Sequence, residues 1–186
     1  LRPQALLVLA NALETSPGAA VLYADDDELG PDGQRRKPDF KPDWNPALLL
    51  GQNYLGGFMA FRRKLLDQIG ASPVELTSSG SWKTALRITA LVPASAIRHL
   101  PFVLSHRPAL VSSEASNATE SARLVGEHLR MQGVDAVAGT VGGRLLVRRP
   151  LPQPVPKVSL VMPTACRLEL LKPCIRGMLE KTAYPD

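Results

Sequence analysis

The sequence predicts an α/β protein with a mixed sheet flanked by helices, and three observations support this fold class. Short apolar runs such as 19–23 and 56–61 are typical of buried strands, whereas elsewhere apolar residues recur at helical spacing. The two kinds of segment alternate along the chain. The composition is ordinary for a globular protein, and 186 residues are enough to bury one sizeable core.

In the first third of the chain, we expect a helix that begins near Pro3 and ends at residues 16–18. Its apolar stripe is predicted to consist of Leu6, Leu9, Ala10 and Leu13. Residues 19–23 form a strand that ends in the acidic residues 25–28. The proline-containing stretch 37–44 is expected to be an extended loop.

Caps and turns delimit the elements that follow. Asn45 is expected to cap a short helix that begins at Pro46. A strand at 56–61 precedes a helix at 63–69, which Gly70 ends. Further along the chain we expect a polar loop at 71–80 and two more helices, at 82–91 and 121–132. An extended segment is expected at 97–104 and a hairpin around 142–143.

Alternating prolines mark the predicted domain boundary. Pro150, Pro152, Pro154 and Pro156 make residues 150–156 a stiff linker between a domain at 1–149 and a second unit at 157–186. In that unit the apolar run 158–162 is expected to be a buried parallel strand, followed by a helix at 168–180. A parallel strand at 158–162 needs a second strand after the helix, and the chain ends before one. The chain also begins without Met. We therefore expect the chain to be a piece of a longer protein.

Composition narrows the classes of partner. The formal charge of +5 is modest, and the few aromatic residues are not interleaved with basic ones, which disfavours a nucleic-acid-binding protein. No apolar run approaches the ~18 residues that span a bilayer. Cys166 and Cys174 are expected to flank a helix, so no disulfide is expected. We predict a cytoplasmic or membrane-peripheral protein of a reducing compartment.

Several strings resemble the inverting glycosyltransferases of family 2, which have the GT-A fold. The longest and most specific runs through Phe40-Lys41-Pro42-Asp43-Trp44-Asn45-Pro46 and Leu49-Leu50-Gly51-Gln52-Asn53-Tyr54. Residues 1–6, 22–28 and 103–107 resemble further stretches of that family. Residues 158–164 resemble the first strand of a fresh domain of the same family.

The resemblance implies an incomplete GT-A fold in which residues 1–149 are the acceptor-side half of one domain and 157–186 open a second. It implies transfer of a sugar from a nucleotide-diphosphate donor to a glycan or lipid-linked acceptor. It also implies Mg²⁺ or Mn²⁺ on the leaving diphosphate, held by a metal motif expected just before Leu1. Exposed sheet edges are expected where the missing halves belong, and with them aggregation or a swapped oligomer.

The candidate site residues each have a structural alternative. Asp25 and Asp27 are expected to line the substrate site, the alternative being a solvated acidic turn. The resemblance implies that His106 reaches the metal or the diphosphate. The alternative is a structural histidine that forms a hydrogen bond near the end of the sheet. The expected substrate contacts are completed by Asp43, Trp44, Gln52, Asn53 and Thr164. The alternative for Trp44 is that it anchors the loop in the core. The alternative for Gln52 and Asn53 is that they cap the preceding short helix.

One departure from the resemblance concerns the catalytic base. Ser81 stands where the family has an Asp that accepts the proton, and Lys83 replaces a second Asp. A serine hydroxyl does not accept a proton at neutral pH, and general-base catalysis contributes ~10²–10⁴-fold to a rate. We therefore expect no transfer activity from this chain alone. A non-catalytic glycan-binding or scaffolding module is the alternative function.

Overall fold

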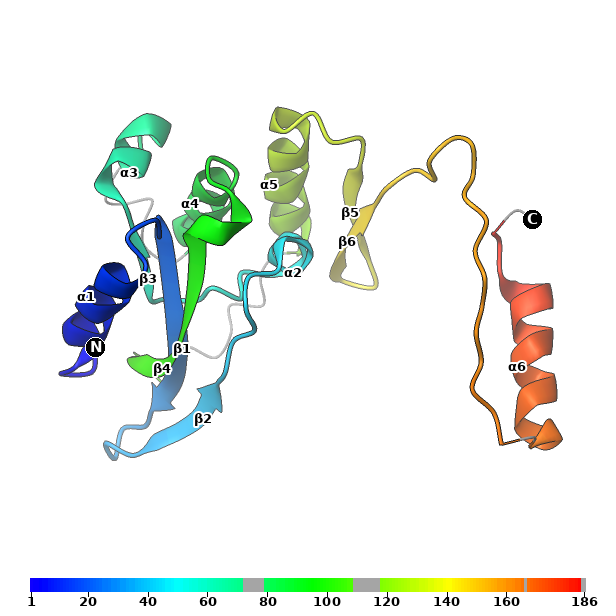
Figure 1. Ribbon diagram of the computed structural model, residues 1–186, viewed down its shortest axis with the longest axis horizontal. Helices are drawn as coiled ribbons and strands as arrows, with labels where there is room; N and C mark the ends of the chain where they lie inside the picture. The colour runs from blue at the N-terminus through cyan, green and yellow to red at the C-terminus, as the bar shows by residue number, and fades with distance from the viewer. Residues whose placement is uncertain (72–78, 109–117, 166, 185–186) are drawn as a thin grey trace. The chain divides into compact units, whose positions relative to one another are not determined.

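The computed structural model describes residues 1–71, 79–108, 118–165 and 167–184. The chain divides into two compact units, Leu1–Arg149 and Pro150–Asp186, which are described separately. The first unit contains parallel and antiparallel strands in one sheet with helices against it (Figure 1). The predicted α/β class with a mixed sheet is therefore confirmed.

Strand β1 (Val21–Leu29) lies at the centre of the sheet. Strand β4 (Ile97–Pro108) runs parallel to it along its whole length. The antiparallel strands β3 (Met59–Phe61) and β2 (Arg35–Asp39) pair with its first and second halves. Because a strand has only two edges, β2 and β3 follow one another along the edge opposite β4.

Apolar side chains pack on both faces of β1. On one face Leu22 and Ala24 join Leu104 of β4 and helix α1 (Ala5–Thr15). On the other, Val21 and Tyr23 join the main core, formed largely by α2 (Pro46–Gly51), α4 (Ser79–Thr89) and α5 (Ala118–Met131). This two-sided burial explains why β1 begins as an unbroken apolar run rather than an alternating one.

Local signals fix several of the predicted elements. The Asn45 side chain accepts a hydrogen bond of 2.9 Å from Leu48 N, so it caps α2 as expected. Helix α3 (Arg63–Ile69) ends at Gly70, whose φ of 60° is left-handed. The hairpin expected around 142–143 is formed by β5 (Val137–Val141) and β6 (Arg144–Arg148), and the 3-10 helix η2 (Ala94–Ala96) leads into β4.

Four features of the first unit differ from prediction. The acidic residues 25–28 lie inside β1 rather than after it, and cationic or imidazole partners allow residues 25–27 to be buried. Residues 35–39 form a strand where 37–44 was expected to be a loop. The stripe of α1 is shifted: Leu6 and Leu13 are exposed, whereas Ala5 is buried because it faces β1 and β4. Pro101 does not interrupt β4, which accommodates extra residues between its pairings with Ala24 and Asp25.

In the second unit, helix α6 (Leu168–Lys181) is confirmed, but the strand expected at 158–162 is absent. Val158, Leu160 and Val161 are exposed, and no neighbouring strand supplies hydrogen-bond partners among the described residues of this unit. A strand requires such a neighbour for its backbone groups. The apolar run alone therefore does not produce a strand here.

Candidate functional site

Three consecutive acidic residues are buried in the second half of β1. Asp25, Asp26 and Asp27 are 3%, 1% and 2% exposed. A buried carboxylate is costly unless a partner compensates its charge. Each of the three has a cationic or imidazole partner from another segment, namely His99 for Asp25, Lys41 and Arg107 for Asp26, and Arg35 and His106 for Asp27.

Asp26 pairs with a buried lysine. Lys41 Nζ donates to Asp26 Oδ2 at 2.8 Å, to Ala24 O at 2.6 Å and to Leu55 O at 2.9 Å, so three acceptors surround the ammonium group. Arg107 Nε lies 2.7 Å from Asp26 Oδ1, but the pair is not aligned for a hydrogen bond, and Oδ1 has no such partner among the described residues. Lys41 thereby ties β1 to the segment that follows α2.

Gly56 makes room for this ion pair. Its φ is +74°, and a Cβ there would lie 2.4 Å from Lys41 Nζ and 2.8 Å from Asp26 Oδ2. Neither the backbone angle nor the space suits a side chain. The glycine is thus part of the site's construction.

Asp25 holds a histidine that sequence reasoning left without a role. His99 Nε2 lies 2.7 Å from Asp25 Oδ1, which also accepts from Lys41 N at 2.9 Å. The His99 ring stacks on Tyr23 at 5.1 Å, and its Nδ1 lies 3.6 Å from Asp43 Oδ1. The Asp43 side chain is 99% exposed, so this predicted substrate residue faces solvent. The feature that points to a role for His99 is its position opposite Tyr23 on the neighbouring strand. That position becomes visible once the register of the sheet is known.

Asp27 holds two groups at once. Arg35 Nε donates to its Oδ2 at 2.6 Å, and His106 Nδ1 hydrogen-bonds its Oδ1. Burial alone would raise the pKa of Asp27, but the hydrogen bonds from His106 and Arg35 hold it below its ordinary value. With Asp27 ionised, the Asp27 carboxylate accepts this hydrogen bond, so Nδ1 of His106 is the donor.

The metal expectation concerns His106. A carboxylate that orients a histidine is a common support for a metal ligand. However, the described residues contain no group of three or more His, Cys, Asp or Glu side chains placed to hold a metal ion. The described residues therefore do not make up a metal site by themselves, and no chemical step is assigned to one.

Three aromatic residues anchor the segment 40–54, namely Tyr23 of β1 and the segment's own Trp44 and Tyr54. Tyr23 Oη donates to Pro42 O at 2.7 Å, and Tyr54 Oη accepts from Asn45 N at 2.8 Å. Trp44 is half-buried and packs against the main core. Burial is the main reason that the pKa values of both tyrosines are raised, so both hydroxyls remain protonated.

The structure brings together two of the predicted site segments. Asn53 Nδ2 donates to Ser81 Oγ at 3.2 Å, across 28 positions of sequence. Asn53 Oδ1 is buried, and the described residues offer it no hydrogen-bond partner. Gln52 is exposed and lies at the C-cap of α2. Trp82 Nε1 donates to Leu49 O at 2.9 Å, which fixes α4 against the segment that carries Asn53.

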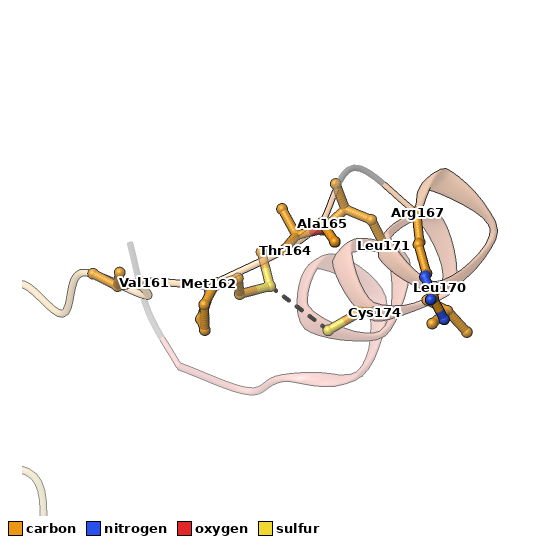
Figure 2. Close-up of a pocket in the computed structure, with 9 residues that line it drawn as sticks. Val161, Met162, Thr164, Ala165, Arg167, Leu170, Leu171 and Cys174 are labelled. Atoms are coloured by element: carbon orange, nitrogen blue, oxygen red, sulfur yellow. Dashed lines mark hydrogen bonds between the residues drawn. The ribbon is translucent and has the colours of Figure 1, made fainter.

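Thr164 lies in the second unit and is exposed. It lines a hollow of about 360 Å³ between residues 161–165 and α6 (Figure 2). Leu170, Leu171 and Cys174 line the helix side, and Cys174 Sγ lies 3.7 Å from Met162 Sδ. Most of this lining is apolar, so it differs in kind from the ion-paired end of β1.

The chain is similar over its whole length to two curated proteins. It is 34% identical to the O-antigen biosynthesis protein RfbC of Myxococcus xanthus, of which it covers 15%. It is 30% identical over 99% of its length to an uncharacterized protein of Sinorhizobium fredii, of which it covers 21%. The chain thus spans about a fifth or less of each relative. No protein-family model matches it.

In the part of the chain that the structure describes, every helix is too short or too polar to cross a membrane.

Proposed function

We propose that this chain serves polysaccharide biosynthesis and forms the acceptor-side wall of a nucleotide-sugar-dependent glycosyltransferase site. Similarity over the whole of this chain to an O-antigen biosynthesis protein, of which it covers 15%, supports the assignment to polysaccharide biosynthesis. The contact between Asn53 and Ser81 carries the assignment of the wall, because it unites the segment 40–54 with the start of α4. The resemblance to family 2 glycosyltransferases places acceptor contacts and the base position in those same segments.

Asn53 is suited to bind a sugar hydroxyl. Its Nδ2 is used by Ser81, while its buried Oδ1 lacks a donor among the described residues. A buried acceptor left without a donor costs about 1–3 kcal/mol, and a hydroxyl of the acceptor glycan would satisfy it. Half-buried Trp44, on the same segment, offers an aromatic surface.

The transfer step itself requires a base. An acceptor hydroxyl attacks the anomeric carbon of the donor, the bond to the diphosphate breaks, and the diphosphate leaves with the bonding electron pair. The hydroxyl proton must pass to a base. The hydroxyl of Ser81 does not serve this purpose at neutral pH, so we expect the chain to bind substrate without transferring sugar.

Ser81 favours a second candidate function, a glycan-binding module that has lost catalysis. The two candidates differ in the nucleotide site. Calorimetry with UDP and Mn²⁺ gives heat if the chain retains such a site and none if it is a glycan-binding module only.

Glycan binding tests the shared part of the proposal. We expect lipid-free bacterial O-polysaccharide to bind the purified chain, and Asn53→Ala to weaken binding about tenfold, which corresponds to ~1.4 kcal/mol. Asn11→Ala, at an exposed position of α1, is the matched control and should bind as the wild type does. Equal binding by the wild type and Asn53→Ala would refute the acceptor-wall assignment.

A further inference from the structure

Three side chains lie in a row across three neighbouring strands. Leu29 of β1 pairs with Arg35 of β2, and Asp27 of β1 pairs with His106 of β4. Paired residues point to the same face of a sheet, as do residues two apart on one strand. Arg35, Asp27 and His106 therefore share one face, and both oxygens of the Asp27 carboxylate are occupied by its two neighbours.

The way Arg35 is held leaves most of its guanidinium unused. It contacts Asp27 through Nε, at 2.6 Å. The Arg35 side chain is 43% exposed, whereas that of Asp27 is 3% exposed. Neither Nη group of Arg35 hydrogen-bonds another side chain or carbonyl in the described part of the chain. A buried carboxylate thus anchors the inner edge of the guanidinium while its outer donors face solvent.

The backbone of β2 is shaped to place Arg35 there. Asp39 pairs with Asp26 but Arg36 pairs with Glu28, so β2 carries a bulge at this point. Within it Lys37 has a φ of 45°, in the left-handed region that residues other than glycine rarely adopt. Bulges are over-represented beside functional sites, where they re-aim side chains.

The row also lies where ligands gather in open α/β sheets. Asp27 and His106 belong to the C-terminal halves of the parallel strands β1 and β4. Ligands bind beyond the carboxyl ends of such strands. Arginine donors in a planar fork match the geometry of phosphate oxygens better than any other side chain.

We propose that Arg35 is a diphosphate-binding residue, positioned by Asp27 and flanked by His106. The diphosphate is that of the proposed sugar-transfer reaction, so the inference rests on the proposed function for its physiological ligand. The same group occurs on a nucleotide-sugar donor and on a lipid-linked glycan. Binding of inorganic pyrophosphate, however, tests the site without any sugar transfer.

Arg36 is a matched control on the same strand. It is 55% exposed and pairs with an aspartate, Asp32, at a comparable distance of 2.5 Å. It pairs with Glu28 in the sheet and therefore points to the opposite face from Arg35. Asp32 is itself 43% exposed, so Arg36 lacks a buried anchor. Replacing either arginine changes the net charge equally.

The experiment is a calorimetric titration of the full chain with pyrophosphate at physiological ionic strength. We expect Arg35→Gln to weaken binding at least about tenfold and Arg36→Gln to leave it within about twofold. Circular dichroism verifies folding. If Arg35→Gln unfolds, Arg35→Lys retains the charge without the planar fork and is expected to weaken binding about threefold or more.

Loss of affinity that is equal in the two variants, or no binding by the wild type, would overturn the site. UDP and farnesyl diphosphate distinguish the sources: the one that binds more tightly than pyrophosphate, in an Arg35-dependent manner, identifies the natural carrier. Pyrophosphate binding that depends on Arg35, together with no glycan binding, would refute the acceptor wall and leave this site standing.

Discussion

Lys41 and Asp26 form an ion pair of 2.8 Å in which both side chains are 1% exposed. A pair so deeply buried survives only because the remaining hydrogen-bonding capacity of the ammonium group is met by two carbonyl oxygens. The pair explains how a strand as acidic as β1 occupies the centre of a sheet. It also fixes the segment that carries the candidate acceptor residues.

Replacing Lys41 tests the importance of this pair for folding. We expect Lys41→Met to lower the free energy of unfolding by about 3 kcal/mol or more, because the buried Asp26 loses the cation that hydrogen-bonds to it. Urea denaturation measures the loss. Lys37→Met removes an exposed lysine that pairs with Glu28 at 3.0 Å and should cost less than about 1 kcal/mol. Similar losses of unfolding free energy in the two variants would show that the buried ion pair stabilises the fold no more than the exposed one.

Alanine substitutions at three glycines distinguish the cost of a left-handed backbone from the cost of a steric clash. Gly56→Ala combines a left-handed φ of +74° with a clash against Lys41, and should be the most destabilising. Gly70→Ala has a φ of +60° but open space, so about 1 kcal/mol is expected. Gly57→Ala has open space and no left-handed φ. Thermal unfolding should rank the three losses in that order, and a Gly56→Ala variant as stable as Gly57→Ala contradicts the packing described.

His128 gives the chain a pH dependence of stability. Burial lowers the pKa of this α5 histidine below 6.5, and its buried Nδ1 lacks a partner among the described residues. The folded state therefore binds the proton less readily than the unfolded state. Stability is retained above pH 6.5 and falls as the pH drops from 6.5 through the lowered pKa.

Unfolding by urea at pH 7.5 and 5 checks this expectation. The wild type should lose more stability between these pH values than His128→Leu, which has no imidazole to protonate. Equal losses would mean that His128 is not responsible.

The cap of α2 contributes a local, separable amount. Asn45→Ala removes the acceptor of the Leu48 N–H and should destabilise the chain by about 1 kcal/mol. Asn45→Asp retains the cap and should cost much less. Because Asn45 N still reaches Tyr54 Oη in both variants, a difference in unfolding midpoint between them reports the side-chain cap.

The parts of the fold that follow from nearby residues are predictable from the sequence. The Asn45 cap, the Gly70 end of α3 and the glycine hairpin each depend on a few consecutive residues. The failed strand at 158–162 shows the limit of this reasoning, because an apolar run says nothing about whether a pairing strand is at hand. Long-range compensation is likewise invisible: Asp25 meets His99 across 74 positions, and Asp27 meets His106 across 79.

The candidate site was predictable in part. The segment 40–54 and Ser81 were singled out by resemblance, and the structure places Asn53 against Ser81. Lys41 and Arg35 were missed, since a lone basic residue in a polar stretch looks like a solvated one. A run of three acids that continues an apolar strand is the signal that should prompt a search for buried cations.

The proposed sugar-transfer site lies at the end of the sheet that carries Asp27. The most direct test of this placement is a nuclear magnetic resonance titration of the isotope-labelled chain. UDP-glucose with Mg²⁺, and separately O-polysaccharide, are the ligands. We predict that the amide shifts of Asp27, Arg35 and His106 respond to the nucleotide sugar, and those of Asn53 and Ser81 to the glycan. Shifts that remain unchanged at all five residues while the chain stays folded would contradict it.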